Sequence, residues 1–223
     1  LPAIEIFGID MSITRHIVMM WVASFLLVVL MVKAFRKPDG VPSGLANFFE
    51  AIVIFLRDEV VLPIMGEDGK KYLPFLLTIF FFVLFCNLLG LIPYSATATG
   101  NISVTAGLAI CIFLVMIGSG MANNGFFGFF KSLIPSGVPP LLLIILIPVE
   151  LISLFVKPFA LCERLFANMV GGHVAILVFL SLIIIMQNEW IAIGAVPFAA
   201  AIYLLEIFVV VVQAFVFTLL STV

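Results

Sequence analysis

Long apolar runs separated by short polar clusters occupy the whole chain, a pattern typical of a protein that crosses a membrane several times. The first run covers residues 13–35 and is interrupted near its start by Arg15 and His16. Positive charges gather at its other end: Lys33, Arg36 and Lys37. Because cytoplasmic ends of membrane spans collect such charges, we predict that this end is cytoplasmic and that the N-terminus lies outside.

The next segment, residues 46–62, differs because its apolar positions recur at helical spacing while most of its charges fall off that stripe. The apolar positions are Phe49, Ile52, Val53, Leu56 and Val60. This pattern predicts an amphipathic helix that lies on the cytoplasmic surface.

Three further apolar stretches complete the chain. Residues 73–122 predict a transmembrane hairpin that turns at 95–100, and a second cytoplasmic connection follows at 123–137. Residues 138–187 contain no turn cluster, although about 20 residues suffice to cross a bilayer. They form either two spans or one strongly tilted helix. After a turn at 188–189, the last apolar helix covers 191–223.

Composition supports this class of protein. The chain of 223 residues is 65% hydrophobic and only 10% charged, whereas soluble domains are about 25% charged. We therefore predict a single integral membrane domain, 1–223, that is all-α and polytopic, with about five membrane helices and one surface helix. The net charge of -2 gives no basic surface for nucleic acid. Three widely spaced cysteines and the lack of a phosphate-binding glycine loop predict neither a metal nor a cofactor.

The candidate chemistry lies in ionisable residues within the last two apolar stretches. They are Glu150, Lys157, Glu163, Arg164, His173 and Glu206. One such group at the centre of a bilayer costs about 2.5–3.5 kcal/mol on insertion scales, so six require a functional or structural reason.

Helical spacing divides these residues between two surfaces. At about 100° per residue, Lys157 and Ser153 lie within about 20° of Arg164, and Glu150 lies within about 40°. Small or amide residues share this stripe and allow close approach of another helix: Ala160, Asn168 and Gly171. His173 lies about 180° from Arg164. Glu206 and Gln213 share a face of the last helix, so a carboxylate and a histidine on neighbouring helices form a candidate proton relay.

Structural explanations compete with these roles. Arg164 could pair with Glu163, although adjacent helical residues point about 100° apart. Lys157 could extend from the membrane boundary to water, and His173 could bond a helix backbone. The asparagines could serve helix packing: Asn87, Asn101 and Asn168.

Four motifs resemble, in order along nearly the whole chain, subunit a of rotary F-type ATP synthases. The most specific are "KPFALCERLFANMVGGH" at Lys157–His173 and "EIFVVVVQAFVFTLL" at Glu206–Leu220. The others are "NLLGLIP" at Asn87–Pro93 and "TGNISVT" at Thr99–Thr105. The resemblance implies a stator subunit that conducts protons through two offset half-channels beside a rotating c-ring, coupling the proton gradient to ATP synthesis or hydrolysis. It also implies that 138–187 is one long helix, which forms a strongly tilted hairpin with the last helix.

The same resemblance implies partners and a location. The partners are the c-ring, the peripheral-stalk b subunits and, indirectly, the nucleotide-binding F1 head, with membrane lipid around the chain and protons as cargo. The chain would not be an enzyme on its own. It would reside in a bacterial inner membrane or an equivalent energy-coupling membrane, with the C-terminus cytoplasmic.

Roles carry over residue by residue. Arg164 matches the family's essential arginine. Residues of the outside half-channel would be Asn101, Asn168, His173, Glu206 and Gln213. Residues of the cytoplasmic half-channel would be Glu150 and Ser153. Lys157 and Glu163 receive no definite role.

Two positions depart from the usual pattern of the family. Many bacterial members have a carboxylate at the position of His173 and a histidine at that of Glu206, and the exchanged pair is also used. Glu163 stands where an apolar residue is more usual, so it either faces the channel or partly neutralises the field of Arg164.

Two rival classes are a secondary transporter with an arginine-centred site and a structural scaffold. The chain shows no inverted repeat of the kind that transporters carry, and a scaffold leaves the charges unexplained.

Overall fold

The computed structural model describes residues 5–6, 9–10, 14–35, 44–92, 97–132, 140–186 and 189–222. Apart from a two-residue antiparallel pair, Glu5–Ile6 with Ile9–Asp10, the elements within these ranges are helical. Five of the helices there are long and apolar enough to cross a membrane. The protein is therefore an all-α polytopic membrane protein, as predicted. Arg36, Lys37 and parts of the predicted turns at 95–100, 123–137 and 188–189 lie outside the described residues.

The chain forms two compact units, one of Leu1–Asn101 with Ala167–Val223 and the other of Ile102–Phe166. Helix α6, Pro140–Met186, belongs partly to each. It is one helix of 47 residues despite Pro148 and Pro158. The long apolar run is therefore one helix and not two.

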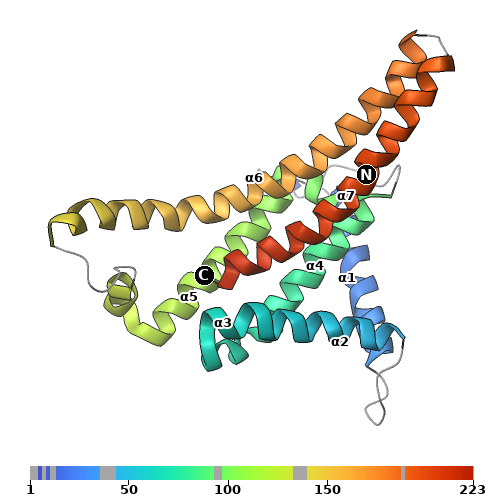
Figure 1. The fold of residues 1–223 in the computed structure, drawn as a ribbon. Helices are drawn as coiled ribbons and strands as arrows, with labels where there is room; N and C mark the ends of the chain where they lie inside the picture. The colour runs from blue at the N-terminus through green and yellow to red at the C-terminus, as the bar shows by residue number, and fades with distance from the viewer. Residues whose placement is uncertain are drawn as a thin grey trace. The chain divides into compact units, whose positions relative to one another are not determined.

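Helix α4, Leu73–Gly90, is the centre of the first unit and packs against α1, Arg15–Ala34, and α7, Glu189–Thr222 (Figure 1). Its aromatic and aliphatic side chains are buried on nearly all sides, which is the pattern of a core helix. Helix α7 buries a stripe at helical spacing toward this core: Glu206, Val210, Gln213, Ala214 and Phe217. Glu206 and Gln213 thus share a face, as the sequence predicted.

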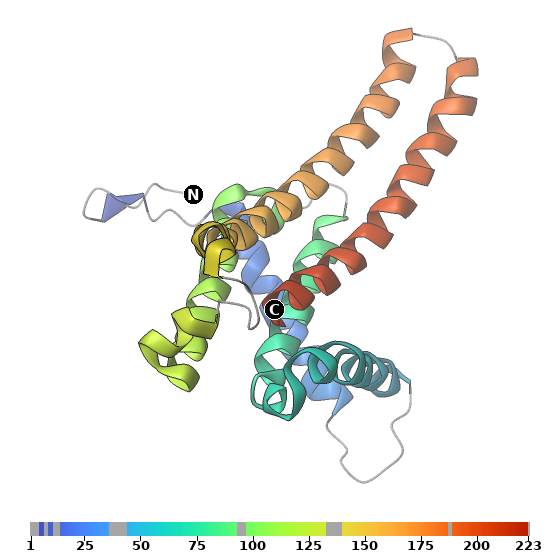
Figure 2. The ribbon, with the colours of Figure 1, turned by 60° about the vertical axis from the view of Figure 1, so that its left-hand side comes forward.

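The predicted surface helix is a series of four helical segments in the first unit. These are α2, Leu45–Phe55, the π-helical Leu56–Val61, α3, Leu62–Met65, and the 3₁₀-helical Gly66–Lys71. Phe49, Leu56 and Val60 are buried, whereas Arg57 and Asp58 are exposed and form an ion pair of 2.7 Å that lowers the pKa of the Asp58 carboxyl. Figure 2 shows these segments running across one end of α4.

Residues 167–186 of α6 run antiparallel to α7 (Figures 1 and 2). Near the turn, the rings of Phe179 and Phe198 stack with centroids 5.6 Å apart. Asn168 and His173 of this part of α6 also form hydrogen bonds with side chains of α7.

In the second unit, α5, Ile102–Ser132, packs on the first part of α6. The hydroxyl of Thr105 lies 3.3 Å from the sulfur of Cys162, and the rings of Phe113 and Phe155 are 5.4 Å apart. The predicted connection begins at residue 123, directly after the apolar span Ile102–Ala122, and its first part is helical, because helix continues to Ser132 after a break at Gly125. Gly125 has φ 71°, a value that glycine adopts without a steric penalty.

Candidate functional site

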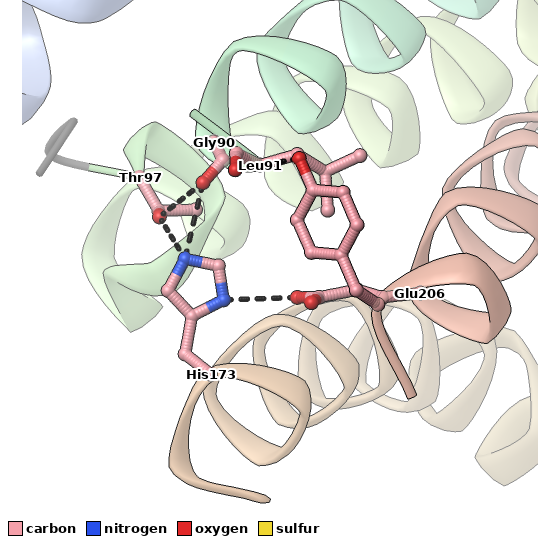
Figure 3. Close-up of polar contacts among 6 residues, drawn as sticks. Gly90, Leu91, Thr97, His173 and Glu206 are labelled. Carbon is pink, nitrogen blue, oxygen red and sulfur yellow. Dashed lines mark hydrogen bonds and ion pairs between the residues drawn. The ribbon is translucent and has the colours of Figure 1, made fainter. Parts of the chain in front are cut away.

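The candidate site is an ionisable pair between α6 and α7. Nδ1 of His173 lies 2.9 Å from Oε1 of Glu206. Glu206 is only 4% exposed, and His173 is partly buried. Figure 3 shows the imidazole between the Glu206 carboxyl on one side and Gly90 and Thr97 on the other. A buried carboxyl thus has a direct partner that can exchange a proton with it.

The surroundings of the imidazole determine which nitrogen carries its fixed proton. Nε2 of His173 lies 3.1 Å from the carbonyl oxygen of Gly90 and 3.4 Å from Oγ1 of Thr97. A carbonyl oxygen only accepts hydrogen bonds, so Nε2 must donate and must carry a proton. The Thr97 hydroxyl donates to the same carbonyl at 3.3 Å, which leaves its oxygen free to accept from Nε2–H.

This tautomer places the mobile proton between His173 and Glu206. With Nε2 protonated, the short contact holds one proton, either on Nδ1 donating to a carboxylate or on Oε1 donating to a neutral ring. Both arrangements keep the hydrogen bond, so the proton can change owner without movement of either helix. The contact can therefore hold one proton on either of its two atoms.

Two glycines make room for this arrangement. A Cβ at Gly172 would lie 2.7 Å from both Cδ and Oε1 of Glu206. A Cβ at Gly90 would lie 2.3 Å from Cε of Met169 and 2.6 Å from Cγ2 of Thr97. The carboxyl therefore occupies space that only a glycine in α6 leaves open, and α4 approaches its neighbours closely at Gly90.

A second polar contact joins the same helices. Nδ2 of Asn168 donates to Oε1 of Gln213 at 3.2 Å. Within the described residues, four buried side-chain atoms lack a hydrogen-bond partner: Asn87 Oδ1, Thr99 Oγ1, Glu206 Oε2 and Gln213 Nε2. Buried polar atoms of this kind are the usual binding sites of internal water. All four belong to the first unit, whose interior therefore has several polar positions besides the pair.

Arg164 belongs to the second unit, together with Glu150, Ser153, Lys157 and Glu163. Arg164 and Glu163 are both exposed, and among the described residues neither forms an ion pair. The two neighbours therefore form no direct ion pair in this part of the chain, and a partial neutralisation of the Arg164 field by Glu163 stays a prediction. Glu150, Ser153 and Lys157 are partly buried on the same helix.

The structure thus brings together four of the residues chosen from sequence: Asn168, His173, Glu206 and Gln213. Asn101 ends the first unit, directly before α5. Sequence reasoning missed Gly90, Thr97 and Gly172. Only the motif "NLLGLIP" drew attention to the region of Gly90, and no local pattern pointed to Thr97, whose contact with His173 spans 76 residues.

The fold and the site together define a polytopic membrane protein with a protonatable pair between two of its helices. Ionisable residues inside the membrane are typical of membrane proteins that conduct ions. The family described as ATP synthase A chain matches residues 17–223. The chain belongs to this family and is an integral membrane protein.

Several relatives are similar over almost the whole chain. ATP synthase subunit a of Chloroherpeton thalassium is 50% identical over 226 residues, which cover 99% of this chain and 68% of that protein. The subunit a of Myxococcus xanthus is 49% identical, covering 96% of this chain and 71% of that protein. For the subunit a of Anaeromyxobacter dehalogenans the identity is 49%, and the match covers 96% of this chain but only 57% of that protein. The chain therefore spans between about half and three quarters of the length of these relatives.

Proposed function

We propose that this chain is the proton-conducting stator subunit of a rotary ATP synthase. It transfers protons through two offset half-channels at its interface with a rotating c-ring, and the transfer couples the proton gradient to ATP synthesis or hydrolysis. The observation that carries the proposal is the 2.9 Å contact between His173 and the buried carboxyl of Glu206, which is short enough for the two groups to share one proton. The chain itself binds no nucleotide and catalyses no reaction alone.

In this scheme, the outside half-channel delivers protons through Asn101, Asn168, His173, Glu206 and Gln213. A carboxyl of the ring receives its proton there and travels with the ring. When it reaches Arg164, the fixed positive charge stabilises the ionised carboxylate, so the proton leaves toward the cytoplasm past Glu150 and Ser153. Since a guanidinium does not lose its proton, Arg164 prevents protons from passing directly between the two half-channels.

The exposure of Arg164 supports this role. A charged side chain facing lipid is expensive, whereas the same side chain facing a ring of carboxyl groups gains a favourable partner. Lys157 lies on the same stripe and has no assigned step. The N-terminus is outside and the C-terminus cytoplasmic, in a bacterial inner membrane or an equivalent energy-coupling membrane. Further partners are the b subunits of the peripheral stalk and, indirectly, the F1 head.

Purification in mild detergent followed by reconstitution tests the proposal. We expect the chain to co-purify with an oligomeric ring and a nucleotide-hydrolysing head, and we expect vesicles with this complex to pump protons when ATP is added. Vesicles with the chain alone should not transport substrates. A chain that transports a solute by itself would instead support the secondary transporter, and the proposal would fall.

The space at Gly172 gives a sharp test of the pair. In Gly172→Ala the new Cβ collides with the Glu206 carboxyl, which must rotate away from His173. We expect proton pumping by the reconstituted complex to decrease by about tenfold or more, the effect of separating one buried hydrogen-bonded pair.

Gly118→Ala, in α5, is the matched control for this variant. A Cβ at Gly118 meets no atom within 4 Å, and both substitutions bring the same gain in helix propensity. Pumping by Gly118→Ala should equal that of the wild type. Equal activity of the two alanine variants would show that the position of the carboxyl does not limit proton transfer.

For Glu163 we expect a substitution to leave proton pumping nearly unchanged. It is exposed and forms no ion pair among the described residues, and its place on α6 lies about 100° from Arg164. Glu163→Leu should therefore retain assembly and ATP-driven pumping within about twofold of the wild type, because exposed substitutions rarely exceed about 0.5 kcal/mol. An assembled but inactive complex would make Glu163 a residue of the proton path.

A further inference from the structure

Both histidines of the chain contact the same threonine, Thr97. Nδ1 of His16, in the first turn of α1, lies 2.8 Å from the carbonyl oxygen of Thr97. The hydroxyl of the same threonine lies 3.4 Å from Nε2 of His173. The sequence contains only these two histidines. The proposed function uses His173 and leaves His16 without a role.

The contact of His16 has a fixed direction. The Thr97 carbonyl can only accept, so Nδ1 of His16 carries a proton and donates it. The same carbonyl accepts from the amide of Gly100 at 3.2 Å and so begins the 3₁₀ turn Ala98–Gly100. Thr97 is therefore held by α1 on one side and by its own turn on the other.

Thr97 in turn holds His173. Its hydroxyl donates to the Gly90 carbonyl at 3.3 Å and accepts from Nε2–H of His173. The Gly90 carbonyl receives the same N–H at 3.1 Å. If Thr97 moved, Nε2 would lose one of its two acceptors, and the other acceptor would lose the hydroxyl beside it. Thr97 therefore adds to the Gly90 carbonyl in stabilising a protonated Nε2, on which the proton shared with Glu206 depends.

We propose that His16 is a positioning residue for the proton relay: its imidazole fixes Thr97 and thereby keeps His173 in the tautomer with Nε2 protonated. A proton does not pass along this connection, because a peptide carbonyl is a poor proton carrier. His16 acts as a hydrogen-bond donor from the first helix. The consequence for transport rests on the proposed function, whereas the effect on the tautomer does not.

The substitution His16→Asn distinguishes a role of His16 as a hydrogen-bond donor from a role as a proton carrier. The side-chain amide of asparagine places an N–H close to the position of histidine Nδ1 but cannot take up and release protons. Alanine removes the donor. Thr97→Val removes the hydroxyl and keeps the main-chain carbonyl, so it breaks the same connection one step closer to His173 without touching α1.

The first measurement is nitrogen NMR of the full chain, labelled with ¹⁵N-histidine and embedded in lipid bilayers. Each His16 variant leaves His173 as the single labelled residue. We expect His173 to show protonated Nε2 in the wild type and in His16→Asn. In His16→Ala and in Thr97→Val, the ratio of this tautomer to the other should decrease by about fivefold, the factor given by one ordinary hydrogen bond. An unchanged His173 spectrum in both variants would overturn the proposal, whatever the chain transports.

The second measurement is ATP-driven proton pumping by the reconstituted complex. His16→Ala should pump about fivefold more slowly than the wild type, and His16→Asn should pump at the wild-type rate. The double variant His16→Ala/Thr97→Val should be no slower than the slower single variant, since both interrupt one connection. A slow His16→Asn with an unchanged His173 spectrum would contradict positioning and make His16 a proton carrier. A tautomer shift without any change in pumping would support the positioning of His173 and count against the relay in the proposed function.

Discussion

Replacing Arg164 with alanine is expected to abolish ATP synthesis that is driven by a proton gradient, while the complex still assembles. Arg164 is exposed on α6 and has no ion-pair partner among the described residues of its own chain, so its removal leaves no unpaired group inside the chain. What is lost is the fixed positive charge that favours ionised ring carboxyls and separates the half-channels. Synthesis in energised vesicles should fall to the background of vesicles without the complex.

Three further variants distinguish the effect of losing the charge of Arg164 from the effects of losing side-chain size and hydrogen bonds. Arg164→Gln keeps hydrogen-bonding groups without charge and should be as inactive as alanine, with passive proton leakage raised above that of the wild type. Arg164→Lys keeps a charge but loses the planar fork of donors, so it should retain at most a small part of the activity. Val156→Ala truncates another exposed side chain of α6 and should behave as the wild type. Normal coupled synthesis in Arg164→Ala would refute the two half-channels.

Much of the fold could be predicted because apolar length and helical spacing are local properties of the sequence. All five long apolar helices begin or end within a few residues of the predicted limits, since hydrophobic runs in such chains have few alternatives to helix. The helical segment that begins with α2 was predicted from its stripe of apolar residues, three of which are buried, whereas its place on the membrane surface stays a prediction. The kink at Gly125 was not predicted. There a single glycine with positive φ allows the helix to continue in a new direction.

The site could be predicted only where the partners sit on long helices. The spacing of Glu206 and Gln213 placed them on one face, and His173 on the preceding helix was the predicted partner of Glu206. The contacts that determine the tautomer of His173 could not be foreseen, because they come from a main-chain carbonyl at Gly90 and from Thr97, directly before a short 3₁₀ turn. Distances of 76 and 83 residues along the chain separate these groups from His173. Such contacts depend on how α4 ends, which no periodic pattern describes.

The second large effect is expected at Glu206. Glu206→Gln preserves side-chain volume, and its amide can still donate to Nδ1 of His173, so the buried contact and the assembly of the complex should survive. An amide cannot release a proton at physiological pH, however, so the pair loses the step that the proposal assigns to it. General acid–base groups commonly contribute about 10²–10⁴-fold to rate, and we expect pumping by the reconstituted complex to decrease by at least about 100-fold.

Glu50→Gln provides the matched control, since it makes the same carboxyl-to-amide change in α2, far along the chain from the pair. It should pump at the wild-type rate. The exchanged variant His173→Glu/Glu206→His supplies a stricter test. Each single substitution leaves two groups of the same kind facing each other, whereas the double exchange restores one carboxyl and one imidazole at the same contact. Because the relay requires one of each rather than a particular order, the double variant should be at least about tenfold more active than either single variant. If Glu206→Gln pumps normally, or if the exchange recovers nothing, then Glu206 stabilises the packing of α6 on α7 and carries no proton.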